Sequence, residues 1–129
     1  MPGYRTLVVD DDAVTRQLLL ELFAEEGYDV RAAADGIEAL DVLRSWRADV
    51  VVLDAVMPRA DAAAFRAAQT AIPALRDVPV VVLSASRPDE LDPLARQLGA
   101  EAALVKPFDV DELLEVIRRV VDREAASRA

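Results

Sequence analysis

Four apolar runs in this sequence each end in polar side chains that could take part in chemistry. In chain order these side chains are Asp10 with Asp11, Asp54, Ser84 and Lys106. Carboxylates held close together repel one another unless a cation lies between them, and Mg²⁺ prefers one or two carboxylates completed by water and phosphate oxygens. An aspartate can attack phosphorus, while a lysine and a metal neutralise the transferring oxygens. The residue types therefore predict half of a phosphoryl-transfer centre.

Asp54 is the strongest single candidate. It follows Val50–Leu53, four consecutive apolar residues of which three are β-branched. Such a run is typical of a strand that is buried on both faces of a parallel sheet. Open α/β sheets bind their ligands beyond the carboxyl ends of the strands, so a carboxylate at this position lies where chemistry is expected.

The other candidates each have a structural interpretation as well. Asp10 and Asp11 could form a polar strand end, Ser84 could be a turn residue, and Lys106 could be a solvated surface residue. Asp12 is better explained as the N-cap of the following helix than as a metal ligand. The functional interpretation is favoured because these residues end different strands of one predicted sheet.

The sequence predicts five strands that alternate with five helices. The strands are expected at residues 7–9, 29–33, 50–53, 80–83 and 102–105. Core-facing rows at helical spacing are Val14, Leu18 and Leu22; Ile37, Leu40 and Leu43; and Leu113, Ile117 and Val120. Helix boundaries are indicated by Gly27 after the first helix and by the pairs Asp35 with Glu38 and Asp109 with Glu112. This alternation predicts an α/β fold, a doubly wound five-stranded parallel sheet with helices on both faces.

Two of the helices have irregular sequences. The third, around residues 61–70, is rich in alanine, and Phe65 is its only large apolar residue. The fourth contains two prolines, and proline is tolerated only in the first turn of a helix. We therefore expect the fourth helix to begin near Pro93 and to bury Leu94, Ala95 and Leu98, with residues 87–92 as a loop.

The composition narrows the class of protein. The 129-residue chain is long enough for one domain with a sizeable core, which we place at residues 1–122, followed by a short polar tail at 123–129 and no output domain. The net charge of −9 argues against a nucleic-acid-binding surface, and the lack of cysteine excludes disulfides. No run has the length of a signal peptide or a membrane span, so we expect a cytoplasmic protein.

Four motifs resemble the receiver domain of two-component response regulators, the CheY-like family. These motifs are LVVDDD, VVVLDAVMP, VVLSA and VKPF, and the resemblance extends roughly from Arg5 to Val121. It implies a flavodoxin-like sheet with strand order 2-1-3-4-5. It also implies a switch that catalyses only its own phosphorylation and dephosphorylation.

The resemblance assigns a role to each candidate residue. Asp54 is expected to be the phosphoacceptor, Ser84 a switch hydroxyl, and Lys106 the lysine that pairs with the phosphoryl group. The expected magnesium ligands are Asp10, Asp11, Asp54 and the backbone carbonyl of Val56. The Lys106–Pro107 peptide bond is expected to be cis.

The same resemblance implies partners. Receivers take a phosphoryl group from a histidine kinase or a phosphotransfer domain, and they signal to a downstream protein through the face made by the fourth helix, fifth strand and fifth helix. Dimerisation through that face stays open, as does a chain that is a piece of a longer regulator.

Three features depart from the family pattern. Ala103 occupies a position that is usually aromatic, Ala62 replaces the usual glycine after Asp61, and the prolines alter the fourth helix. None of these changes affects the phosphorylation residues, so only the downstream coupling is expected to differ. Val56 and Ser86 lead us to expect a persistent phosphoryl group, because attacking water would be poorly oriented.

Three other functions are compatible with parts of this fold prediction. A nucleotide- or flavin-binding protein would need glycine and free N–H groups after the first strand, where this chain has Asp10–Asp12. A magnesium phosphohydrolase would need a second acid at Val56. A pseudo-receiver, which keeps the fold without phosphorylation, stays open because of Ala103.

Overall fold

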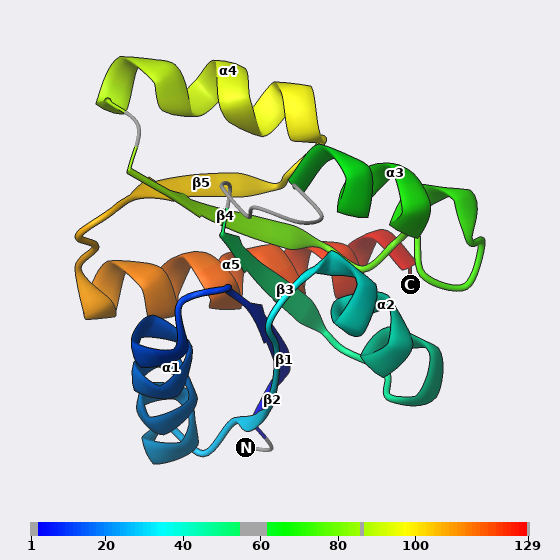
Figure 1. Ribbon diagram of the computed structural model, residues 1–129, viewed down its shortest axis with the longest axis horizontal. Coiled ribbons are helices and arrows are strands. Elements are labelled where there is room, and N and C mark those ends of the chain that lie inside the picture. The colour runs from blue at the N-terminus through cyan, green and yellow to red at the C-terminus, as the bar shows by residue number, and fades with distance from the viewer. Residues whose placement is uncertain (1–2, 55–61, 86, 129) are drawn as a thin grey trace.

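A computed structural model describes residues 3–54, 62–85 and 87–128 of the chain (Figure 1). In order, the elements are β1 (Arg5–Val9), α1 (Ala13–Glu25), β2 (Asp29–Ala33), α2 (Gly36–Ser45), β3 (Val50–Asp54), α3 (Ala62–Ala71), β4 (Val80–Ser84), α4 (Pro88–Leu98), β5 (Ala102–Val105) and α5 (Val110–Arg128). The five predicted strands and the alternation of strands with helices are confirmed.

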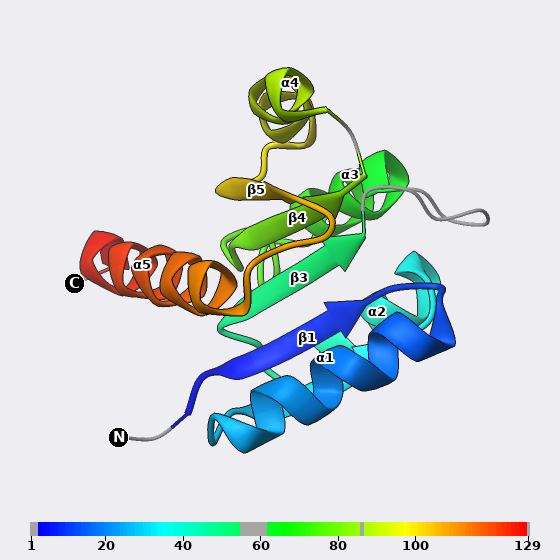
Figure 2. The same ribbon diagram turned by 90° about the vertical axis from the view of Figure 1, so that its left-hand side faces the viewer.

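The strands form one parallel sheet, as the sequence pattern predicts, in the order β2-β1-β3-β4-β5 that the family resemblance implies. Helices cover both faces (Figure 2). Alternate residues of β3 point to opposite faces, so Val50 and Val52 pack with α1 and α5, while Val51 and Leu53 pack with α2, α3 and α4. β3 lies at the centre of the sheet, which places Asp54 at the middle of its carboxyl edge.

The predicted core face of α1 is wrong at Val14 and Leu18, whereas Leu22 is partly buried against the core. Val14 and Leu18 are 76% and 56% exposed, whereas Leu19 and Phe23 are buried. Two rows at i, i+4 spacing compete in this helix, and the row containing the larger Phe23 packs under the sheet beside Tyr28. Periodicity alone cannot choose between two such rows, because the choice depends on how the connections orient the helix.

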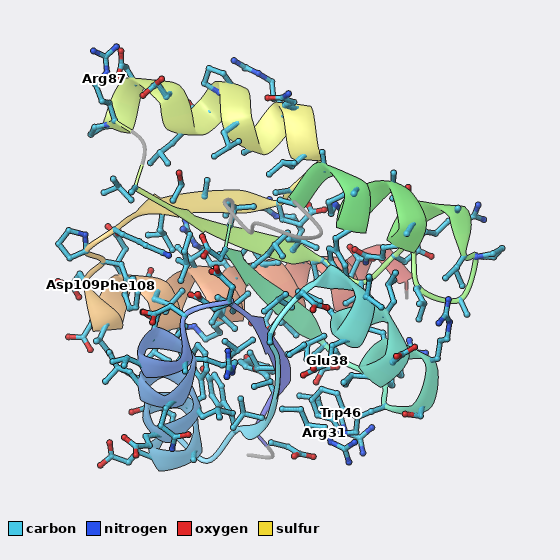
Figure 3. All side chains as sticks on the ribbon, viewed as in Figure 1. Arg31, Glu38, Trp46, Arg87, Phe108 and Asp109 are labelled. Atoms are coloured by element: carbon cyan, nitrogen blue, oxygen red, sulfur yellow. The ribbon has the colours of Figure 1, made fainter. Side chains whose placement is uncertain are left out.

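The other two predicted rows have different outcomes. In α2, Leu43 is buried as predicted, but Ile37 is 65% exposed and Ala39 takes its place in the core. In α5, Leu113, Ile117 and Val120 are all buried, which confirms the prediction. At the other end of α2, Trp46 is buried beneath the Arg31 guanidinium, 5.0 Å from the ring centroid (Figure 3).

The predicted start of α4 is also wrong. The helix begins at Pro88, follows Arg87 (Figure 3), and includes Pro93 in its interior. Pro88 suits the first helical position because no N–H is needed there, and the Arg87 N–H donates to the Glu90 carboxylate at 3.1 Å. These starting signals outweigh the loss of one intrahelical hydrogen bond at the exposed Pro93. Leu98 is buried as predicted, while Leu94 and Ala95 are only partly buried.

The predicted helix boundaries are largely confirmed. Gly27 follows the end of α1 with a φ of 83°, and the Asp35 and Asp109 carboxylates accept N–H bonds from Glu38 and Glu112 at 2.8 and 3.2 Å. α5 continues to Arg128, so residues 123–128 extend that helix. Among the described residues no helix combines the length and the apolarity needed to cross a bilayer.

Candidate phosphorylation and metal site

The predicted site residues meet at the carboxyl edge of the sheet. Asp54 is the last residue of β3 and Ser84 is the last residue of β4. Asp10 follows β1 directly, and Lys106 follows β5. Because all five strands are parallel and in register, their carboxyl ends bring together residues that are far apart in the sequence.

Three carboxylates form the acidic part of this site. One oxygen atom from each of Asp10, Asp11 and Asp54 can be chosen so that all three lie within 4.8 Å of one another. Asp10 is 2% exposed and the Asp54 side chain 11% exposed, while Asp11 is open to solvent. The cluster is therefore buried on one side and accessible on the other.

Asp10 is held in place by the surrounding backbone. Its carboxylate accepts the Asp12 N–H at 2.9 Å, its own N–H donates to the Ala33 carbonyl at 3.1 Å, and its carbonyl accepts from Arg16 Nη1 at 2.9 Å. Burial raises the pKa of the Asp10 carboxyl, and the negative charge of Asp54 raises it further. The fold therefore holds a carboxylate where its charge is unfavourable without a nearby cation.

Lys106 supplies one such cation. Its Nζ lies 3.3 Å from Asp54 Oδ1 and 3.8 Å from Asp10 Oδ2. With all groups ionised, three carboxylates and one ammonium leave two negative charges uncompensated. A divalent cation would balance them, and carboxylate oxygens are the ligands that Mg²⁺ prefers. Asp10, Asp11 and Asp54 therefore fit a magnesium ion in both charge and ligand type.

Ser84 ends β4, which lies between β3, the strand of Asp54, and β5, the strand that Lys106 follows. It is 2% exposed, and its carbonyl accepts the Lys106 N–H at 2.7 Å, which fixes the end of β5 against the end of β4. The Lys106–Pro107 bond is cis, as predicted. Ser84 therefore ends the strand next to β3, and Lys106 follows the strand beyond it.

Asp12 is a helix cap, as the sequence predicts. Its carboxylate accepts the Thr15 N–H at 3.3 Å at the start of α1. The hydrogen bond from the Thr15 hydroxyl lowers the pKa of Asp12. The expected Val56 ligand, along with Asp61 and Ser86, lies outside the described residues.

Sequence reasoning missed two features beside the site. Arg16 binds the Asp10 carbonyl, and a solitary arginine one turn after the cap is too weak a signal to predict this bond. The second feature is the exposed pair Val14 and Leu18, which begins one position after the first residue of α1.

Comparison with known proteins decides the family. The sequence model of the response regulator receiver domain matches residues 6–118. The chain belongs to this family. As a receiver, it is 39% identical over 120 residues to the transcriptional regulatory protein PdtaR of Mycobacterium tuberculosis, an alignment that covers 92% of the chain and 57% of PdtaR. The chain thus spans little more than half the length of this relative.

Solved receiver structures share the fold. The chemotaxis response regulator CheY4 of Vibrio cholerae has a TM-score of 0.82 at 32% identity, with 92% of this chain and 98% of that chain covered. The receiver domain of the sensor histidine kinase PA1611 of Pseudomonas aeruginosa has a TM-score of 0.82 at 28% identity, covering 93% and 98%. That domain was solved with a magnesium ion coordinated in its active-site cleft.

Proposed function

We propose that this receiver accepts a phosphoryl group on Asp54 in a magnesium-dependent reaction, with a histidine kinase or a phosphotransfer protein as the donor. The main support for this proposal is the position of Lys106 Nζ, which lies 3.3 Å from Asp54 Oδ1 beside a cluster of three carboxylates. Family membership supports the proposal, and so does the magnesium ion in the PA1611 receiver.

In the proposed reaction, an Asp54 carboxylate oxygen attacks the phosphorus of a donor phosphohistidine. The new O–P bond forms as the P–N bond breaks, and the electron pair of the broken bond stays on the imidazole nitrogen. Lys106 neutralises charge on a phosphoryl oxygen, because its ammonium already lies beside Asp54. Ser84, the last residue of the adjacent strand β4, would donate its hydroxyl to another phosphoryl oxygen.

Asp10 and Asp11 would hold the magnesium ion together with Asp54, and the Val56 carbonyl is a further proposed ligand. The ion supplies charge neutralisation between the carboxylates and the phosphoryl oxygens. The buried Asp10 is kept in position by the Asp12 N–H and the Ala33 carbonyl. Its carboxylate is therefore pre-oriented before the ion binds.

The donor protein has a candidate docking surface on α1. Val14 and Leu18 lie one helical turn apart, both are exposed, and α1 begins directly after the acidic residues of the site. Large exposed apolar side chains next to a reactive centre favour docking of a partner protein. We propose that the donor packs on this pair while it presents its phosphohistidine to Asp54.

We further propose that output is binding of a downstream protein to the face made by α4, β5 and α5, with dimerisation through the same face left open. The proposed receiver needs neither nucleic acid nor membrane for this step, and a cytoplasmic location is part of the proposal. PdtaR is named as a transcriptional regulatory protein, and this chain covers 57% of it.

A pseudo-receiver, an interaction domain without phosphorylation, is the second candidate. It is favoured by Ala103, which is partly buried beside the core of the α2–α4 face and offers only a methyl group there. It would keep the fold and leave Asp54 unmodified.

Intact-mass measurement after incubation with Mg²⁺ and acetyl phosphate tests both candidates. We expect a gain of one phosphoryl group that requires Mg²⁺ and is absent in Asp54→Ala. Asp12→Asn is a matched control, because asparagine also caps a helix and Asp12 is not a proposed ligand. No gain in the wild-type protein, with magnesium binding confirmed by calorimetry, would favour the pseudo-receiver.

A further inference from the structure

A side chain of α3 caps the end of α4. Arg66 Nε donates to the Leu98 carbonyl and Arg66 Nη2 donates to the Gly99 carbonyl, both at 2.8 Å. The last carbonyls of a helix have no partner within the helix, and the carboxyl end carries partial negative charge. One guanidinium therefore satisfies two carbonyls of a neighbouring helix and compensates its terminal charge.

The same guanidinium is held by a buried amide. Arg66 Nη1 donates to Gln69 Oε1 at 2.6 Å, and Gln69 is fully buried. The Gln69 Nε2 group donates to the Leu75 and Val78 carbonyls at 2.8 and 3.0 Å. The amide thus uses its oxygen and both of its hydrogens, which fixes its orientation and that of Arg66.

These bonds connect three segments of the chain. They join the carboxyl end of α4, the middle of α3, and the turn at residues 72–78 that leads into β4. Burial in this region lowers the pKa of Arg66, although this guanidinium stays charged at any physiological pH. Partly buried, charge-assisted hydrogen bonds of this kind are stronger than bonds between neutral groups.

Both helices follow strands that end at the proposed phosphorylation site. α3 begins at Ala62, eight positions after Asp54, and α4 begins at Pro88, four positions after Ser84. Phe65 of α3 and Leu98 of α4 also share one apolar cluster with Leu53 of β3. A displacement of α3 would therefore reach the carboxyl end of α4 through the Arg66 bonds and this shared packing.

We propose that Arg66 is the positioning residue that couples α3 to α4, so that phosphorylation of Asp54 changes the carboxyl end of α4. This inference rests on the proposed phosphorylation of Asp54 and adds the route by which it would reach the α4 surface. Arg66 contacts neither Asp54 nor the phosphoryl group in this proposal; it acts through α4.

Leucine-methyl NMR of the full chain tests the proposal. The probe is beryllofluoride with Mg²⁺, which mimics an aspartyl phosphate and does not hydrolyse. In the wild-type protein, we expect it to shift the methyl signals of Leu83 and Leu104, beside the site, and that of Leu98 at the end of α4. In Arg66→Met, we expect the Leu98 shift to be lost while the Leu83 and Leu104 shifts are retained.

A merely structural role of Arg66 would move the Leu98 signal of the free protein but leave its response to beryllofluoride intact. Arg96→Met is the matched control, because Arg96 is exposed on α4 and should give the wild-type response. Should Arg66→Met fail to fold, Arg66→Lys keeps the charge without the planar fork. It should then show a smaller Leu98 response, and a full response would overturn the coupling.

Different results would overturn the proposed coupling and the proposed phosphorylation. A wild-type response at Leu83 and Leu104 without one at Leu98, or a full Leu98 response in Arg66→Met, would overturn the coupling alone. A wild-type protein that shows no methyl response and no beryllofluoride binding would overturn the proposed function and the coupling that rests on it.

Discussion

Lys106 Nζ lies 3.3 Å from Asp54 Oδ1, although 51 residues separate the two in the sequence. β4 lies between the strands that carry them, and Asp54 pairs with Leu83 while Val105 pairs with Ser84. The lysine therefore reaches across one strand to the proposed phosphoacceptor. This arrangement gives the first prediction.

Replacement of Lys106 by methionine should slow phosphorylation of Asp54 by acetyl phosphate, because charge on the phosphoryl oxygens would lose its nearest cation. Loss of one preorganised electrostatic partner costs about 10²-fold in rate in comparable sites. A time course of intact mass at saturating Mg²⁺ measures the effect. The phosphorylation rate of Lys106→Arg should lie between those of the wild-type protein and Lys106→Met, because the larger guanidinium keeps the charge but not the compact geometry. A methionine variant as fast as wild type would contradict the proposed role.

Replacement of Asp10 by asparagine should stabilise the magnesium-free protein by about 1 kcal/mol, because it removes a buried charge beside Asp54. The same change should abolish the stabilisation that Mg²⁺ gives to the wild-type protein. Urea unfolding with EDTA and with Mg²⁺ measures both effects. Asp12→Asn should keep the wild-type response to Mg²⁺. An equal gain from Mg²⁺ in Asp10→Asn and wild type would exclude Asp10 as a ligand.

Replacement of Leu18 by glutamate should slow phosphoryl transfer from a donor protein about 10-fold or more, because charge would replace an apolar contact at the docking surface. Transfer from acetyl phosphate should be unchanged, since that donor needs no protein surface. Radiolabel transfer from a phosphorylated histidine donor provides the measurement. Ile37→Glu is the control, because Ile37 is similarly exposed but lies on α2. Equal slowing by both changes would argue against a specific surface on α1.

Replacement of Pro93 by alanine should stabilise the protein by about 1–3 kcal/mol, since alanine restores the N–H that the interior of α4 lacks. The gain is reduced by the greater freedom of alanine in the unfolded chain. Urea unfolding measures it. Pro88→Ala should give no such gain, because the first helical position needs no N–H donor. A loss of stability in Pro93→Ala would show that the proline is accommodated without cost.

The strand pattern and the site residues could be predicted from the sequence. Buried parallel strands must be almost entirely apolar, so runs such as Val50–Leu53 are recognisable, and the polar residue that ends each run marks the carboxyl edge of the sheet. Asp54, Asp10, Ser84 and Lys106 are recognisable in this way, and the parallel strands place them at one edge of the sheet. The helix caps Asp12 and Asp35 were predictable for a different reason, because their hydrogen bonds join residues that are close in the sequence.

Only the tertiary structure decided the orientation of the helices and the contacts between them. Val14 and Leu18 fit a core row as well as Leu19 and Phe23 do, and the choice depends on how α1 packs on the sheet. The bonds from Arg66 to Leu98 and Gly99 span more than 30 residues. Local sequence cannot specify such bonds, because they form only after two helices have packed side by side.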